Sequence, residues 1–456
     1  MHFKNILIGF FCGCLGMPVL AAQQKPDDLF FSSGLVQQQQ QTDPLPPLPP
    51  SSTEDQLDHT LTLQECINIA LENSPSAVAA KLAVQEAHIN LNLSRSEFLP
   101  TASAQASTSY FATKPAEAAH YSDHGSSDAS AQVSLSLSGI TDKVRGVKIS
   151  KLALEQAELA LANQTNAIAR NVKKAYYALL SAQRAVAIRT QSRDLYKDQY
   201  ERTSEYFRLG LRPKVDQTTA EVNLNNEELK LIRARNLVKT ASATLANAMG
   251  VTTSLTLQIE DIGEQEKFDI PFDEAVSIAY QNRPDVLSSK AGLKISQIKL
   301  NQAKAGFFPT FSFSAGFTKY SDDLSLDNED ARLMASVNIP IFSAFKTYNN
   351  VKQVRVSFEK SLNSDRGLVN DVFLEVQKAY IQMQEAAESI PIAVLNVEKA
   401  KENLELAQGR YNEGIGDIIE LKDAEVAYTD AELSLLTARY DYAAAVADVK
   451  QAMGTN

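Results

Sequence analysis

The feature that most restricts the fold is one long uninterrupted run, residues 142–208. It contains no proline, and its only glycine is Gly146, close to the start. The run is rich in Ala, Leu, Glu, Gln, Lys and Arg, which have high intrinsic helix propensities. A helix of about 67 residues would be roughly 100 Å long, whereas helices of globular domains usually have about 8–20 residues. The sequence therefore predicts an elongated helical protein, or a part of one.

The N-terminus has the pattern of a secretory signal peptide. Lys4 supplies a positive charge, residues 6–20 form a short apolar run, and small residues that suit cleavage follow. Cys12 and Cys14 lie inside this segment and leave lipidation open, but bulky residues precede them, so we expect ordinary cleavage. The sequence predicts an exported protein with a signal peptide over residues 1–22.

Composition then excludes several classes of function. Residues 23–60 include a glutamine run and a proline-rich run, a composition that cannot bury a core, so we expect a disordered leader. The net charge of −11 argues against nucleic acid as the main partner. After cleavage Cys66 is the remaining cysteine, so an internal disulfide is not expected.

After the leader, the sequence repeats itself. The segment LTLQECINIALENSP, which begins at Leu61, aligns with IPFDEAVSIAYQNRP, which begins at Ile270, and the triplet Ala-Met-Gly closes both copies. A duplication of about 200 residues is too long for a solenoid repeat. We therefore predict two structural repeats, residues 61–269 and 270–456.

Each predicted repeat contains a helical stretch, two strands, the long helix, a glycine turn and a further helix. The helices are expected at residues 61–97, 142–208 and 213–249, and again at 271–306, 345–412 and 417–453. Apolar residues recur along the long helix at the alternating spacing of four and three that is typical of coiled coils. They are Ile168, Val172, Ala175, Leu179, Ala182 and Val186. In the second copy, Pro391 is expected to kink the helix or to remove a hydrogen bond.

Four runs alternate apolar and polar residues with a period of two. They lie near residues 99–112, 130–138, 308–320 and 333–342. Transmembrane barrel strands show this alternation over about ten residues, and a soluble half-buried sheet shows it too, so both interpretations stay open. Because the smallest barrels have about eight strands, four strands would have to be pooled with those of other copies.

In the order and duplication of these motifs, the sequence resembles the TolC-like outer-membrane efflux family. The resemblance rests on the two repeat heads, on VNIPIF at residues 337–342 and on RYNEGIGDIIELKDAEV at residues 410–426, and it covers residues 61–454. It implies an α+β membrane protein that assembles as a homotrimer. Twelve pooled strands would form one β-barrel in the bacterial outer membrane, and the long helices would form an α-helical barrel that extends into the periplasm.

The resemblance also implies a periplasmic mouth, closed near the helix turns at Gly210 and Gly414. The acidic ring of the family falls on Glu420 and Asp423. In a trimer these carboxylates would favour cations and raise one another's pKa values through like-charge repulsion. The alternative is an ordinary solvated helix face.

The gate network of the family can be carried over only in part. Its tyrosine and aspartate match Tyr411 and Asp216, but the arginine that joins them is replaced by Gly416. Arg212, on the neighbouring turn, is the candidate substitute. The resemblance therefore predicts a gate whose latch differs from that of the family.

Candidate metal and catalytic residues are few. His120, Asp123 and His124 are close in sequence, but we expect an exposed polar loop there. The acidic loop from Asp322 to Asp330 lacks the spacing of a calcium loop. We find no motif for nucleophilic or phosphate chemistry, and therefore predict a non-enzyme without a cofactor or metal.

The predicted function is the outer-membrane channel of a tripartite efflux or type I secretion system, a passive duct for export. The expected partners are a periplasmic adaptor protein, an inner-membrane pump or ABC transporter, and outer-membrane lipid. The alternatives are a periplasmic adaptor, which the duplicated hairpin disfavours, and a coiled-coil structural rod, which has no use for strands. Whether the exported substrate is a drug, a metal ion or a protein is not encoded in a readable way.

Overall fold

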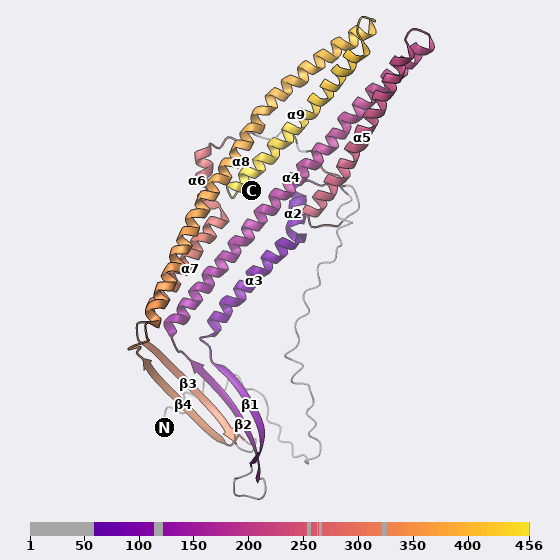
Figure 1. Cartoon of the computed structure of the whole chain (residues 1–456). Helices are drawn as coiled ribbons and strands as arrows, with labels where there is room; N and C mark the ends of the chain where they lie inside the picture. The colour runs from indigo at the N-terminus through magenta and orange to yellow at the C-terminus, as the bar shows by residue number, and fades with distance from the viewer. Residues whose placement is uncertain are drawn as a thin grey trace, which may run out of the picture. The chain divides into compact units, whose positions relative to one another are not determined.

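The computed structural model describes residues 59–113, 122–252, 257–261, 263, 267–321 and 326–455, with the backbone alone for 110–113 and 122–127. Two successive sets of elements follow the same order (Figure 1). The first set is α2 (Leu63–Asn73), α3 (Pro75–Ser96), β1 (Thr101–Thr113), β2 (Ser122–Ser136), α4 (Ile140–Arg208) and α5 (Lys214–Ala248). The second set is α6 (Phe272–Asn282), α7 (Pro284–Ala305), β3 (Thr310–Ser321), β4 (Asn328–Asn338), α8 (Lys346–Asn412) and α9 (Ile418–Ala452).

The two longest helices, α4 and α8, have 69 and 67 residues, close to the lengths predicted from the sequence. Helix α8 is continuous through Pro391. The expectation of single helices over residues 61–97 and 271–306 is wrong, because each stretch is broken. The breaks fall at Ser74 and Arg283, which have extended backbone. Each of these residues precedes a proline, whose ring disfavours helical conformation in the residue before it.

The strands form one antiparallel sheet in the order β1-β2-β3-β4. Its register places apolar residues of neighbouring strands on one face: Val133 lies opposite Phe317, and Phe311 lies opposite Val337. Strands β1 and β4 are the two edges of this sheet.

Two strand boundaries differ from the predicted ones. The strand predicted at 130–138 begins at Ser122, because a run without apolar residues still pairs through its backbone with β1. The strand predicted at 333–342 spans Asn328–Asn338. It ends before Pro340, which has no backbone N–H to donate to a ladder.

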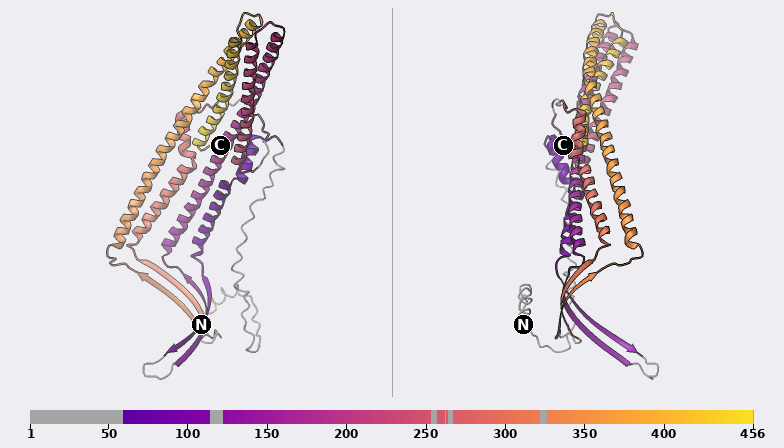
Figure 2. Two further views of the ribbon diagram at one scale, coloured as in Figure 1. Left: turned by 45° about the vertical axis from the view of Figure 1, so that its right-hand side comes forward. Right: turned by 90° about the vertical axis from the view of Figure 1, so that its left-hand side faces the viewer.

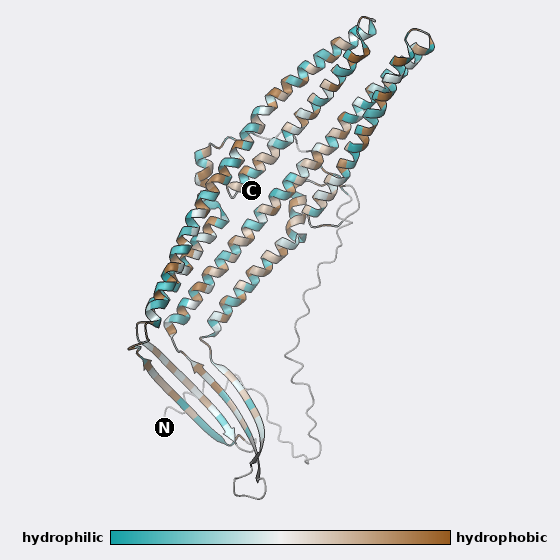
Figure 3. Cartoon of the chain, in the orientation of Figure 1, coloured by the Kyte–Doolittle hydropathy of each residue, from teal (hydrophilic) through white to brown (hydrophobic). Residues whose placement is uncertain are grey.

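Helix α4 is the centre of the helical layer. It packs against α3 and α7 in the half near the sheet and against α5 and α9 in the other half, while α8 packs against α7 and α9 (Figures 1 and 2). None of the described helices has an apolar window long enough to cross a membrane. Figure 3 shows hydrophilic residues recurring along each long helix.

Two apolar cores lie around the middles of the long helices. The first core joins α4 to α2 and α5 and reaches Ala443 of α9, and the second joins α8 to α6 and α9. Leu179 and Tyr176 of α4 are fully buried in the first core, and the Tyr176 hydroxyl donates to the carbonyl oxygen of Glu260 at 2.6 Å. Burial also raises the pKa of the Cys66 thiol to about 12, so this cysteine is an unreactive packing residue.

Candidate functional site

The two pairs of long helices each end in a tight turn. We call α4 with α5 the first hairpin, α8 with α9 the second hairpin, and the end where their turns lie the turn end. Gly210 and Gly414 occupy these turns with φ of 71° and 75°. Glycine adopts such backbone readily because it has no Cβ, which explains its presence at both positions.

Arg212 connects the two hairpins at the turn end. Its Nη1 lies 3.8 Å from Oδ2 of Asp216. Its guanidinium carbon lies 5.3 Å from the centre of the Tyr411 ring, which belongs to the second hairpin. An arginine at this distance from an aromatic face is attracted to the ring. The structure therefore brings Arg212, the candidate substitute for the family arginine, close to Asp216 and Tyr411, the two residues carried over from the family gate.

Tyr411 is buried among small apolar side chains. Its hydroxyl, within the described residues, has no hydrogen-bond partner, so it does not bond directly to Asp216. A small group of buried residues surrounds it, which we call the turn core. These residues are Ala220, Ala407, Ile418, Leu421 and Ala424.

Gly416 has a steric reason to be glycine. Its N–H donates to the carbonyl oxygen of Arg410 at 2.9 Å. A Cβ at this position would lie 3.0 Å from the backbone nitrogen of Tyr411 and 3.1 Å from Cβ of Arg410. The turn is thus packed against the end of α8, and an arginine at position 416 would require the backbone to move.

Glu420 and Asp423 are both exposed in the first turns of α9. Oε1 of Glu420 lies 3.2 Å from Nε of Arg410 at the end of α8. The sequence analysis missed this ion pair, which offsets part of the negative charge near the turn.

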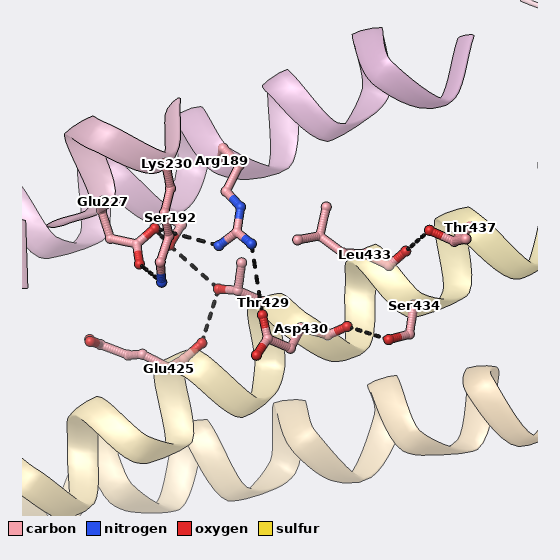
Figure 4. Close-up of polar contacts among 10 residues, drawn as sticks. All are labelled: Arg189, Ser192, Glu227, Lys230, Glu425, Thr429, Asp430, Leu433, Ser434 and Thr437. Carbon is pink, nitrogen blue, oxygen red and sulfur yellow. Dashed lines mark hydrogen bonds and ion pairs between the residues drawn. The ribbon is translucent and has the colours of Figure 1, made fainter. Parts of the chain in front are cut away.

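A second polar feature lies further from the turns, where α4 meets α5 and α9. Figure 4 shows the side chains of Arg189, Ser192, Glu227, Lys230, Thr429 and Asp430 gathered between these three helices, with Thr429 also donating to the backbone carbonyl oxygen of Glu425. We call it the polar cluster. It consists of Arg189, Ser192 and Tyr196 of α4, Glu227 and Lys230 of α5, and Glu425, Thr429 and Asp430 of α9.

Glu227 is the anchor of the polar cluster on the first hairpin. It is only 3% exposed. It accepts a hydrogen bond from Lys230 at 2.6 Å and one from Ser192 at 3.4 Å, and Arg189 lies 3.6 Å away. A carboxylate this deeply buried needs such partners, because desolvation of an unpaired charge is costly.

Glu425 is the buried acid on the second hairpin. It accepts a hydrogen bond from the hydroxyl of Tyr196. Burial raises the pKa of Glu425 to about 7, and the nearby charge of Glu227 acts in the same direction. Burial and the neighbouring carboxylates also raise the pKa of Tyr196, so this phenol stays protonated as the donor.

The structure gives no evidence for a metal site at the residues that the sequence analysis considered. The side chains of His120, Asp123 and His124 lie outside the described residues, as do Asp322 and Asp323. In the part of the chain that the structure describes, no group of three or more His, Cys, Asp or Glu side chains is arranged to hold a metal ion.

Comparison with known proteins agrees with this architecture. The model of the family described as outer membrane efflux protein matches residues 66–251 and 275–455. The probable efflux pump outer membrane protein TtgC of Pseudomonas putida is 22% identical over 414 residues, 88% of this chain and 84% of the relative. The alkaline protease secretion protein AprF of Pseudomonas aeruginosa is 22% identical over 299 residues, 63% of this chain and 61% of the relative.

Among solved structures, the Campylobacter jejuni CmeC outer membrane channel has the same fold. Its TM-score is 0.74 at 19% identity, with 86% of this chain and 85% of that chain covered. The chain belongs to the outer membrane efflux protein family. It is a TolC-like outer-membrane channel of the kind used in tripartite efflux and type I secretion, with a periplasmic helical part. Proteins of this class are channels rather than enzymes, and they work as trimers with adaptors and inner-membrane pumps.

Proposed function

We propose that three copies of this chain close into one export duct. The observation that carries this proposal is the pair of open edges. The sheet ends in β1 and β4. Helix α3, which comes directly before β1, and α5 lie on one side of α4, while α8, which comes directly after β4, is the outer helix on the other side. An unpaired edge strand can pair with the edge of another copy, so β4 of one copy can pair with β1 of the next. Repeated contacts of this kind close into a ring when the angle between neighbouring copies is suitable. Three copies of four strands give a closed sheet of twelve.

Exposed apolar side chains on the edge helices support this assembly. On α5, Val215, Val222 and Leu229 are more than half exposed and recur every seven residues. On α8, Leu374, Ile381 and Leu395 fall in the same seven-residue frame. This spacing is typical of helices that pack against a partner in a coiled-coil manner. A second copy of the chain supplies that partner, with α5 of one copy against α8 of the next.

The turn end forms the periplasmic mouth in this assembly. Glu420 and Asp423 of three copies form the acidic ring, and the contact of Arg212 with Asp216 and Tyr411 holds the gate. Arg212 contacts Asp216 and Tyr411 in place of the family's arginine, whose position Gly416 occupies in this chain. Gly210 and Gly414 mark the tips of the turns.

The cargo and the partners follow from the class of protein. The duct works with a periplasmic adaptor and an inner-membrane pump or ABC transporter, and outer-membrane lipid contacts the apolar face of the sheet. One relative is named for efflux and another for protease secretion, so both small molecules and proteins are candidate cargo. The inner-membrane partner decides between them.

The remaining parts of the chain have simpler proposed roles. Residues 1–22 are a cleaved signal peptide, and residues 23–60 are a leader. Residues 61–269 and 270–456 are two copies of one ancestral unit, as their common order of elements suggests.

Purified protein in planar bilayers tests this function. We expect a heat-sensitive trimer in outer-membrane fractions and stable conductance in the bilayer. Replacing both Glu420 and Asp423 with Ala should raise the conductance and weaken block by divalent cations, because the acidic ring is removed. A monomer in the soluble periplasmic fraction, without conductance, would overturn the proposal.

A further inference from the structure

The polar cluster occupies a position where helices usually present apolar side chains to one another. Ser192, Glu227, Glu425 and Thr429 are each at least nine-tenths buried, with exposed fractions of 4%, 3%, 7% and 5%. They lie between the first and second hairpins, on the same helices that meet through apolar residues in the first core.

The contacts within the first hairpin are closer than those that cross to the second. Lys230 and Glu227, both on α5, approach to 2.6 Å. Across the boundary, Thr429 donates to Ser192 at 3.4 Å, and Arg189 lies 3.8 Å from Asp430. Within α9, Thr429 donates to the carbonyl oxygen of Glu425 at 2.9 Å, so the shorter contacts lie within each hairpin and the boundary is joined by longer ones.

A boundary of this composition can part at a low cost. Polar groups that separate exchange their hydrogen bonds for bonds to water, so the net loss is small. Apolar groups that separate expose surface to water without compensation. In the turn core, the next layer toward the turns, the first hairpin supplies a single buried residue, Ala220, beside the partly buried Tyr200, so the apolar contact across the boundary is small there.

We propose that the polar cluster is a latch between the two hairpins of one chain, closed when the periplasmic mouth is closed and parted when it opens. This inference rests on the proposed function and deepens it, because it places the moving contact within the chain. It assigns roles to Arg189, Ser192 and Thr429 that the family gate does not contain.

The chemistry of Glu425 makes the latch sensitive to protonation. Protonated Glu425 places no second negative charge beside Glu227 of α5, although the Tyr196 hydroxyl of α4 by itself favours the ionised carboxylate and lowers its pKa. Ionised Glu425 is opposed by burial and by Glu227, with Arg189 and Lys230 already paired to that carboxylate. On α9 itself, Lys422, Asp423 and Asp430 lie within a few residues of Glu425.

Helix α8 carries Lys401, Glu402 and Glu405 near the residues that meet this part of α9, and all three side chains are exposed. It meets the neighbouring turn of α9, at Leu421 and Ala424, through Leu404 and Ala407. The groups that act on the pKa of Glu425, Tyr196 and Glu227, both belong to the first hairpin, so its protonation acts on the boundary with that hairpin.

A reversible disulfide tests the latch. The hydroxyl oxygens of Ser192 and Thr429 are 3.4 Å apart, so S192C/T429C should form a disulfide with little movement of the backbone. In planar bilayers, we expect the reduced double variant to show opening events and the oxidised variant to lose them. A reducing agent should restore them.

The matched control is S296C/S361C, whose hydroxyl oxygens lie 3.2 Å apart between α7 and α8. This pair lies within the second set of elements, so its oxidation should leave opening events unchanged. Opening events that persist in oxidised S192C/T429C would overturn the latch. Absence of conductance in every variant, including the wild type, would instead overturn the proposed duct.

Thiol labelling gives a second readout that does not depend on opening events. T429C should react slowly with a small charged methanethiosulfonate, because the position is 5% exposed. Adding R212A loosens the gate and should speed the labelling by roughly two- to fivefold, since labelling follows the population of the parted state. An unchanged rate would also overturn the latch. Cys66 is fully buried and stays unlabelled.

Discussion

The first core and the polar cluster join the same helices by opposite means. In the first core, α4 presents Tyr176 and Leu179, which are fully buried against apolar neighbours. In the polar cluster, the same face of α4 presents Arg189, Ser192 and Tyr196. We infer from this difference that α4 keeps a permanent junction at its middle and a separable one toward its turn. On this inference, the apolar contacts at the middle of α4 stabilise the chain, and the polar contacts nearer the turn separate when the hairpins move.

The largest effect is expected at the first core. Leu179→Ala removes a fully buried side chain and should lower the free energy of unfolding by about 2–5 kcal/mol. The exposed Leu195, on the same helix, is the control, and its replacement should cost about 0.5 kcal/mol or less. Thermal or denaturant unfolding of the purified protein measures both. Equal costs would show that the middle of α4 is no more firmly packed than its turn-side part.

A smaller effect on stability, but a larger one on opening, is expected at the polar cluster. Arg189→Met removes the cation that reaches Asp430 across the boundary and also takes a partner from the buried Glu227, which the parted state would expose to water, so it should favour the parted state by about 1–3 kcal/mol. The open fraction in bilayers would then rise by roughly tenfold or more. Arg193→Met is the matched control, because the ion pair of Arg193 with Asp194 stays within α4. If both variants open equally, Arg189 has no special role.

The pH dependence of opening follows from Glu425. Its pKa in the packed state, about 7, lies above the ordinary value of 4.5, so the packed state binds the proton more tightly. The packed state is therefore most favoured at low pH and loses this advantage as pH rises from 4.5 through about 7. Opening should increase over this range.

Glu425→Gln should make opening nearly independent of pH over that range, because its amide does not titrate. Glu228→Gln, at an exposed position of α5, should keep the wild-type profile. Conductance recorded as a function of pH distinguishes the two variants. A wild-type profile in Glu425→Gln would assign the pH dependence to other groups.

The smallest effect is expected at the turns. Arg212→Ala removes the contact with Tyr411, for which we expect about 0.5–1 kcal/mol. Arg208→Ala is the control, since Arg208 pairs with Glu205 on its own helix. Open probability in bilayers measures both variants. An effect larger than that of Arg189→Met would place the main latch at the turns instead.

The parts of the fold with a strong periodic signal were predictable from the sequence. The lengths of α4 and α8 followed from an uninterrupted helical composition. Val172 and Leu179, two apolar residues of the predicted coiled-coil repeat, are buried. Strand ends and helix breaks were less predictable. Ser74 and Arg283 end short helices through the proline that follows, and β2 begins in a run without an apolar pattern.

The polar cluster was missed because charged residues on a helix usually face solvent. The signal was present in the spacing. The alternating steps of three and four that run through Val186 continue to Arg189 and Tyr196. The coiled-coil repeat of α4 thus continues with the same spacing while its residues change from apolar to polar. Glu227 and Glu425 could not have been found this way, because their burial depends on which helices α4 meets.

The central claim is that the hairpins part near the turns and stay joined at the middle. Spin-label distances at two levels test it most directly. Labels at the exposed positions 191 of α4 and 427 of α9 report on the polar cluster, and labels at 178 and 441 report on the middle. Between the wild type and Arg189→Met, we predict a longer distance for the first pair and an unchanged distance for the second. Lengthening of both pairs, or of neither, would contradict the account.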